Sequence, residues 1–146
     1  MTDIERVTQV LTELLEDVHT RQKDTINGLM DPQLHQINVD EQSVTFRYTV
    51  LPWEANRYGQ LHGGIMTAMM DHACGLAVTA YTGYKAPTLN LSADFIRPAN
   101  VGDHLLVKAE VLSAGRTVIR MRAEIRQQET GKVVSACTAN FFNKEA

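Results

Sequence analysis

The chain has 146 residues, a length that suits a single domain over 1–146 with a core that needs no disulfide or metal. Apolar residues make up 44% and charged residues 21%, which excludes disordered, collagen-like and coiled-coil classes. Fourteen Lys and Arg against 17 Asp and Glu give a net charge of −3, so no broad positive field exists and nucleic acid is not an expected partner.

The two cysteines, Cys74 and Cys137, lie far apart in apolar stretches, with no CxxC spacing and no histidine cluster. This pattern predicts reduced, buried thiols and no bound metal. No basic stretch followed by an apolar run opens the given sequence, so we expect no secretory signal. Its most apolar run, 65–84, holds Asp71 and His72, and an acid costs about 2.5 to 3.5 kcal/mol at the centre of a membrane. We therefore expect a cytoplasmic protein without a membrane partner.

The first part of the chain predicts a helix, a loop and a hairpin. A capping box at Thr2–Glu5 and apolar residues at helical spacing predict an amphipathic helix over about 2–18. Polar residues with Asn-Gly and Asp-Pro breakers predict a loop over 20–32. Segments 34–39 and 44–50 are rich in β-branched and aromatic residues, which predicts two paired strands.

The second part predicts one long helix and then four strands. Residues 63–81 are apolar on most of their circumference and are followed by Gly83, which predicts a helix enclosed by other elements. Short turns then separate four strand-like segments and favour antiparallel neighbours. These segments are 88–96, 104–112, 117–126 and 133–142. The predicted fold is α+β, an antiparallel sheet wrapped around a central apolar helix.

Asp71 is the only formally charged side chain between Arg57 and Lys85, and it lies two turns into the most apolar helix. Desolvation there would favour the neutral acid and bring the carboxylate toward the strength of a general base. The alternative is a solvent-facing stripe, because Thr67 and Gly75 fall on the same side of the helix. The spacing alone leaves both interpretations open.

Gly63 and Gly64 stand at the start of this helix, where the first backbone N–H groups lack intrahelical partners and the macrodipole is positive. Residues without side chains let a ligand oxygen approach these amides, which can stabilise an oxyanion. A glycine pair also suits a tight entry turn. The pair alone therefore indicates either an oxyanion site or a turn.

The run from Asn56 to Asp71 resembles the signature of hotdog-fold acyl-CoA thioesterases, most closely the phenylacetate-degradation (PaaI-like) branch. Its pattern is Asn, two residues, Gly, two residues, His-Gly-Gly, six residues and Asp, and every fixed position is filled. Segments 94–98 and 101–103 also resemble the family, as does the order of elements. The resemblance implies a hotdog fold and hydrolysis of an acyl- or aryl-CoA thioester without metal or redox cofactor, coenzyme A being part of the substrate.

The resemblance also implies roles for five residues. Asp71 matches the acid that activates water or attacks the thioester, and Gly63 matches the amide donor to the thioester carbonyl. Asn56 matches the residue that holds the carbonyl or the water, and His62 matches a residue that braces the loop and the helix start. Thr88 falls where some relatives place a water-orienting hydroxyl.

Further residues are candidates for binding the substrate. The phosphates of coenzyme A need local cations despite the negative net charge. The candidate cations are Arg57, Lys85, Arg97 and Arg116. Gly64 is a candidate contact at the helix start, and Met66 belongs either to an adaptable acyl pocket or to the plain core.

The spacing of Gly63 and Asp71 predicts a site shared between subunits. Eight residues along one helix give a rise of ~12 Å, whereas both groups must lie near one reacting carbon. A site that uses both therefore takes Asp71 from one subunit and Gly63 from its neighbour, with two equivalent sites per homodimer. In the resembling family such dimers commonly pair into homotetramers.

Two other functions compete with this prediction. A 4-hydroxybenzoyl-CoA or other aryl-CoA thioesterase would use the same groups, and a non-catalytic acyl-CoA binding or sensing module would use the fold without the chemistry. A desolvated carboxylate such as Asp71 gives an acyl-binding pocket no advantage, which favours the enzyme. A hotdog dehydratase is disfavoured because it needs an acid and base pair beside the acyl carbons.

Overall fold

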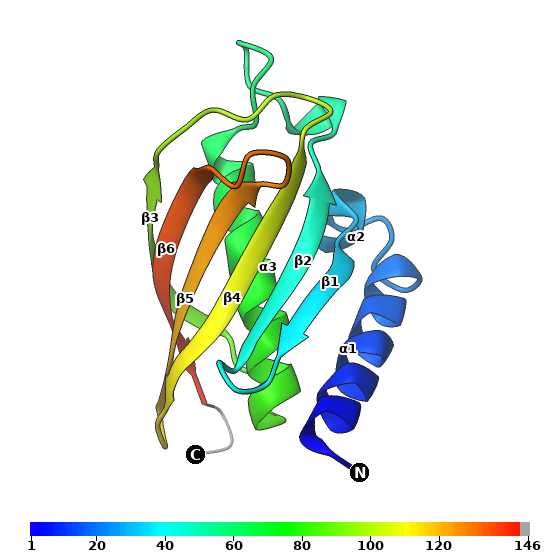
Figure 1. The fold of residues 1–146 in the computed structure, drawn as a ribbon, viewed down its shortest axis with the longest axis vertical. Helices are drawn as coiled ribbons and strands as arrows, with labels where there is room; N and C mark the ends of the chain where they lie inside the picture. The colour runs from blue at the N-terminus through cyan, green and yellow to red at the C-terminus, as the bar shows by residue number, and fades with distance from the viewer. Residues whose placement is uncertain (144–146) are drawn as a thin grey trace.

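The computed structural model describes residues 1–143, in which one antiparallel sheet curves around a long helix (Figure 1). The helices are α1 (Asp3–His19), α2 (Ile26–Met30) and α3 (Gly63–Thr82), with a short 3-10 turn η1 (Pro52–Glu54). The strands are β1 (Gln33–Asn38), β2 (Ser43–Thr49), β3 (Thr88–Phe95), β4 (His104–Ala114), β5 (Val118–Gln127) and β6 (Val133–Phe142). Across the sheet their order is β1-β2-β4-β5-β6-β3.

The central helix α3 packs against β2, β3, β4, β5 and β6. Its buried residues are mainly Met, Ala, Leu and Val, and they meet the inward-facing side chains of the strands. The helix ends at Gly83, whose φ of 77° lies in the left-handed region that glycine adopts without strain. This confirms the predicted α+β hotdog arrangement. Within the described residues, no helix is long and apolar enough to cross a membrane.

The first helix, α1, packs on α3 and β1 (Figure 1). The predicted capping box is present: Thr2 Oγ1 accepts from the Glu5 N–H at 3.2 Å, and the Thr2 N–H donates to Glu5 Oε2 at 3.1 Å. Arg6 Nη1 donates to the Ala80 carbonyl at 3.1 Å and ties α1 to the last turns of α3. The buried face of α1 consists of Val7, Leu11, Leu15 and Val18.

The predicted loop over 20–32 is corrected by the structure, because this segment contains α2. Thr25 caps the helix through a hydrogen bond from the Gly28 N–H to its Oγ1 at 3.4 Å. Asp31 ends it in the left-handed conformation, with φ 56°. A helix this short has little intrinsic stability, but the fully buried Met30 anchors it to the core.

The position of β3 differs from the prediction that strands joined by short connections lie side by side. It pairs with β6 at the edge of the sheet, with Ala93 opposite Cys137, and the chain then crosses the end of the sheet to β4 (Figure 1). The connection 96–103 reaches roughly 26 Å when extended, more than the roughly 14 Å of three strand spacings. The sheet can therefore close around α3 without a hairpin at this point.

The other edge of β3 has no hydrogen-bonded strand among the described residues. Large apolar side chains lie exposed along it and just beyond it, namely Leu89, Phe95 and Ile96. A long edge with exposed apolar residues is a place where a further strand can add.

Candidate active site

The segment 51–62 between β2 and α3, here called the strap, folds back on itself before the helix begins. Ala55 and Leu61 form an isolated antiparallel bridge, and the Asn56 N–H donates to the Gln60 carbonyl at 2.6 Å. Asn56 Oδ1 accepts from the Tyr58 N–H at 2.9 Å and from the Gln60 N–H at 3.1 Å. The side-chain oxygen Oδ1 of Asn56 is therefore occupied within the turn. The Nδ2 amide is the part of the side chain that can hydrogen-bond a ligand.

The start of α3 presents one free backbone donor. His62 is the N-cap, and its Nδ1 accepts from the Gly64 N–H at 2.8 Å. Gly64, predicted to contact substrate, therefore has its amide occupied by His62. The Gly63 N–H forms no hydrogen bond within the described residues, so it remains available to an oxygen from outside.

A cavity of about 370 Å³ opens beside Gly63. Its walls combine apolar side chains with the polar Asn56 and Arg97. An ideal Cβ on Gly63 would lie 3.3 Å from Phe95 Cζ, so the glycine lets this ring lie close over the helix start. Arg97 stands at the rim, where its Nη1 donates to the Val133 carbonyl at 2.8 Å. The cavity thus joins several of the predicted residues, namely Asn56, Gly63, Met66 and Arg97.

Asp71 lies two turns further along α3 and is held by the first residue of β3. Thr88 Oγ1 donates to Asp71 Oδ1 at 2.6 Å, a short charge-assisted hydrogen bond. In the single chain Asp71 is half-buried and Thr88 is exposed. The predicted desolvation of Asp71 is therefore not supplied by one chain, because the sheet ends at β3 and leaves this flank of α3 open.

Other titratable groups adjoin Asp71 on α3. Burial lowers the pKa of His72 to about 4, so its imidazole is neutral at pH 7. Cys74 hydrogen-bonds Cys137, and both cysteines are buried and unpaired by a disulfide, as the sequence predicts. Among residues 1–143, no three His, Cys, Asp or Glu side chains are grouped so that they could hold a metal ion.

Two of the remaining predicted cations, Lys85 and Arg116, lie away from the cavity beside Gly63. Lys85 follows the C-terminal end of α3, and Arg116 lines a separate cavity of about 560 Å³ with Tyr84. The 20 residues of α3 place its two ends ~30 Å apart, so these cations do not share a site with Gly63 of the same chain. The Arg57 guanidinium lies 4.8 Å from the centre of the Tyr58 ring.

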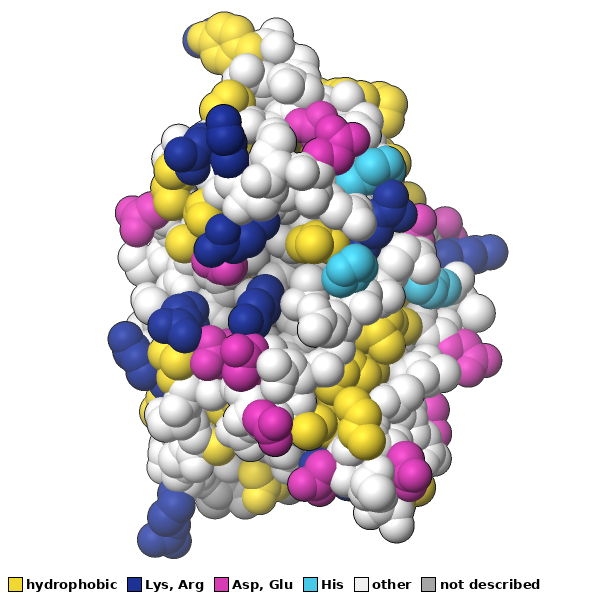
Figure 2. Space-filling model, viewed as in Figure 1, with side chains coloured by type: hydrophobic (Ala, Val, Ile, Leu, Met, Phe, Trp, Pro, Cys, Tyr) yellow, Lys and Arg dark blue, Asp and Glu magenta, His cyan; other side chains and the backbone are white. Residues whose placement is uncertain are grey.

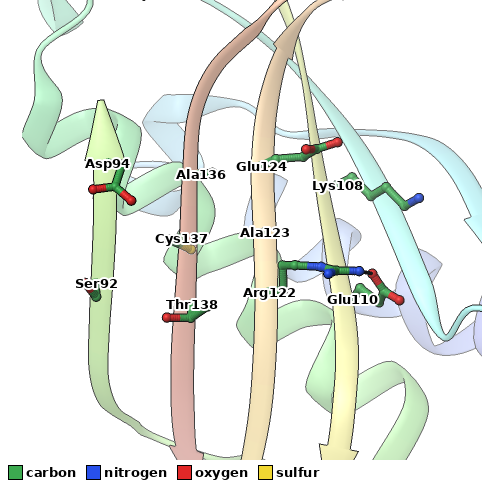
Figure 3. Close-up of a pocket in the computed structure, with 10 residues that line it drawn as sticks. All are labelled: Ser92, Asp94, Lys108, Glu110, Arg122, Ala123, Glu124, Ala136, Cys137 and Thr138. Carbon is green, nitrogen blue, oxygen red and sulfur yellow. Dashed lines mark hydrogen bonds and ion pairs between the residues drawn. The ribbon is translucent and has the colours of Figure 1, made fainter. Parts of the chain in front are cut away.

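The outer face of the sheet, turned away from α3, is rich in charged side chains (Figure 2). It carries another cavity of about 370 Å³, bordered by β3, β4, β5 and β6 (Figure 3). Two of its cations are already paired, Arg122 with Glu110 at 2.6 Å and Lys108 with Glu41 at 2.9 Å. Because the sheet separates this cavity from α3, it adds no group to Asp71.

Glu54 is the acidic residue that the sequence analysis missed. Its side chain is fully buried, Oε1 accepts from the Leu51 N–H at 2.7 Å, and burial raises its pKa to about 7. The available signal was weak, a single acid within the otherwise apolar stretch 50–55 that has no helical or strand period.

The part of the chain from the strap to β6 matches known proteins. The family model described as Thioesterase superfamily matches residues 58–134. Human acyl-coenzyme A thioesterase 13 is 25% identical over 81 residues, which are 55% of this chain and 58% of that protein. The chain thus spans less than two thirds of the length of this curated relative.

Solved structures match more of the chain. A phenylacetic acid degradation-related protein from Ralstonia eutropha JMP134 is 30% identical, with a TM-score of 0.73, and the match covers 80% of this chain and 88% of that chain. The PaaI protein of E. coli, from the phenylacetic acid degradation operon, is 21% identical with a TM-score of 0.81, over 95% of this chain and 94% of that chain. The latter likeness concerns the fold.

Proposed function

We propose that this chain, which belongs to the Thioesterase superfamily, hydrolyses an acyl- or aryl-CoA thioester to the free acid and coenzyme A. The PaaI-like resemblance of the chain is confirmed by the match to the phenylacetic acid degradation-related protein of Ralstonia eutropha JMP134. The observation that carries the proposal is the 2.6 Å hydrogen bond from Thr88 to Asp71, which fixes a carboxylate on a helix whose first amide is free. Thioester hydrolysis needs both groups, a base or nucleophile and an oxyanion donor.

In the proposed reaction, the Gly63 N–H and the Asn56 Nδ2 amide hydrogen-bond the thioester carbonyl oxygen. In one route, Asp71 acts as a general base and takes a proton from water while the water oxygen bonds to the carbonyl carbon. In the other route, an Asp71 oxygen bonds to the carbonyl carbon itself, and water then hydrolyses the resulting anhydride to release the free acid. In both routes the carbon–sulfur bond breaks and the departing thiolate gains a proton. Thr88 orients the Asp71 carboxylate throughout. His62 holds the helix start through the Gly64 amide.

The proposed site is shared between two copies of the chain. Gly63 and Asp71 are ~12 Å apart along one helix, too far to act on one carbon. Antiparallel pairing of two β3 strands through their free edges would cover Leu89 and Asp71 and bring Gly63 of the partner subunit to the acid. Two such dimers are proposed to form a tetramer, as in the resembling family. Sedimentation equilibrium tests the assembly, and a 16.3 kDa monomer with full activity would contradict sharing.

A panel of acyl-CoA and aryl-CoA thioesters, assayed for release of free thiol, tests the activity. We expect release above the enzyme-free rate for at least one thioester. Calorimetry with the same thioesters distinguishes the thioesterase from a non-catalytic binding or sensing module. Such a module would bind the thioesters and release no thiol. The panel also shows whether the site prefers an aryl or an alkyl acyl group.

Replacing Thr88 by Ala is expected to lower kcat roughly 10- to 100-fold, because a hydrogen bond to a charged group contributes about 1.5–3 kcal/mol. Thr88→Ser keeps the hydroxyl and is expected to retain most of the activity. Thr138→Ala, which removes another exposed strand hydroxyl, is the matched control. Equal kcat values for Thr88→Ala and wild type in steady-state thiol release would contradict the orienting role.

A further inference from the structure

Glu54 is a buried acid that the proposed reaction does not use. Its side chain is 0% exposed. Oε1 accepts one hydrogen bond, from the Leu51 N–H, and Oε2 is buried without a partner among residues 1–143. Acids are rarely buried without a cation or several donors, because leaving water penalises the charged form. The neutral acid is therefore the form that suits this position.

The backbone of Glu54 connects this side chain to the candidate active site. Its carbonyl oxygen accepts from the His62 N–H at 2.9 Å, so the two ends of the strap meet at Glu54. The next residue, Ala55, pairs with Leu61, and Asn56 follows directly. The buried side chain thus fixes to the core the same segment that carries Asn56 and leads into Gly63.

Within residues 1–143, no cation acts on the Glu54 carboxyl. The Tyr48 phenol on β2, fully buried and without a partner among the described residues, interacts electrostatically with Glu54. Burial raises the pKa of Tyr48, which keeps this phenol neutral. Cys74 on α3 interacts with Tyr48 in turn, and the hydrogen bond with Cys137, together with burial, raises the pKa of the Cys74 thiol. Burial raises the pKa of Glu54 and outweighs the hydrogen bond from the Leu51 N–H, which lowers it.

We propose that Glu54 is a positioning residue whose neutral side chain holds the strap packed against the core, here called the sealed strap. Ionisation of Glu54 then lets the strap leave the core, here called the released strap, and this displaces Asn56 and Gly63. The effect on catalysis rests on the proposed function, whereas the effect on the strap does not. The strap thereby makes the site depend on pH through a group that never touches substrate.

The sign of this dependence follows from the two protonation states. The pKa of Glu54 is about 7 in the folded chain, against an ordinary value of 4.5, so the folded form binds more protons between these values. The stability that this group contributes is complete below pH 4.5 and is lost as the pH rises through 7. A difference of this size changes the equilibrium between the sealed and released strap roughly 300-fold.

The single tryptophan of the chain, Trp53, is adjacent to Glu54 and reports on the strap without any substrate. We expect the fluorescence of wild type to change in a transition centred near pH 7. Glu54→Gln keeps an oxygen for the Leu51 N–H and stays neutral, so its fluorescence is expected to be flat from pH 5 to 8.5. Glu16→Gln, the same substitution at an exposed position of α1, is expected to behave like wild type. The same transition in Glu54→Gln, or none in wild type, would overturn the proposal.

Two further measurements keep the test decisive. Hydrogen exchange of peptide 51–62 in wild type, corrected for intrinsic base catalysis, is expected to lose protection across pH 7; unchanged protection would overturn the proposal even if Glu54→Gln fails to fold. For a thioester that is turned over, kcat/KM of wild type is expected to fall above pH 7 relative to Glu54→Gln, with Glu54→Ala impaired at every pH. If wild type releases no thiol from any thioester tested while its fluorescence transition is present and that of Glu54→Gln is flat, the proposed function fails and the strap proposal stands.

Discussion

Replacement of Asp71 by Ala is expected to lower thiol release from a CoA thioester at least about 100-fold, the usual effect of losing general-base help. The fold is expected to survive, because Asp71 is half-buried on the open flank of α3 and its side chain is hydrogen-bonded to the exposed Thr88. Steady-state assays measure the loss, and circular dichroism with sedimentation measures the fold and the assembly.

The matched control is Asp94→Ala on β3, an exposed carboxylate on the outer face of the sheet (Figure 3). Because the sheet separates Asp94 from α3, its removal is expected to leave turnover within about twofold of wild type. Turnover by Asp71→Ala above a tenth of the wild-type value would remove Asp71 from the proposed mechanism.

Joint unfolding and refolding of two inactive variants, Asp71→Ala and Gly63→Val, is expected to restore about a quarter of wild-type activity. Even a single Cβ at position 63 would meet the Phe95 ring at 3.3 Å, so valine displaces this ring and obstructs the amide. In a heterodimer with shared sites, one site receives both lesions and the other receives neither. Half of a statistical mixture is heterodimer, and each heterodimer regains one intact site.

Each variant refolded alone provides the control, since neither homodimer contains an intact shared site. Native mass spectrometry shows whether heterodimers formed. If they formed without activity, the site lies within one chain, and either Gly63 or Asp71 loses its proposed role. Recovery of activity would support both assignments in one measurement.

Much of the fold could be predicted because the signals are local. The Thr2–Glu5 capping box, the apolar run of α3 and Gly83 each act within a few residues, and the structure contains all three. The edge position of β3 and the short helix α2 depend on how distant segments pack. The closure of the sheet around α3 determines the position of β3, and the burial of Met30 stabilises α2. Neither leaves a periodic pattern in the sequence.

The sequence predicted which residues form the candidate site, but not the hydrogen-bond partners and the burial of the residues around them. The signature placed Asn56, Gly63 and Asp71, and the structure adds that Asn56 and Gly63 share a cavity. The occupied amide of Gly64 could not be inferred, because it depends on the His62 rotamer. The burial of Glu54 likewise depends on long-range packing.

The edge strand β3 places two requirements on the same eight residues. Its first residue, Thr88, holds the Asp71 carboxylate, and its free edge is the proposed contact with a second copy. A site completed across that edge makes turnover per chain a function of protein concentration. Well below the dimer dissociation constant, the fraction of chains in dimers falls in proportion to protein concentration. Dilution alone would therefore abolish turnover while every chain remains folded.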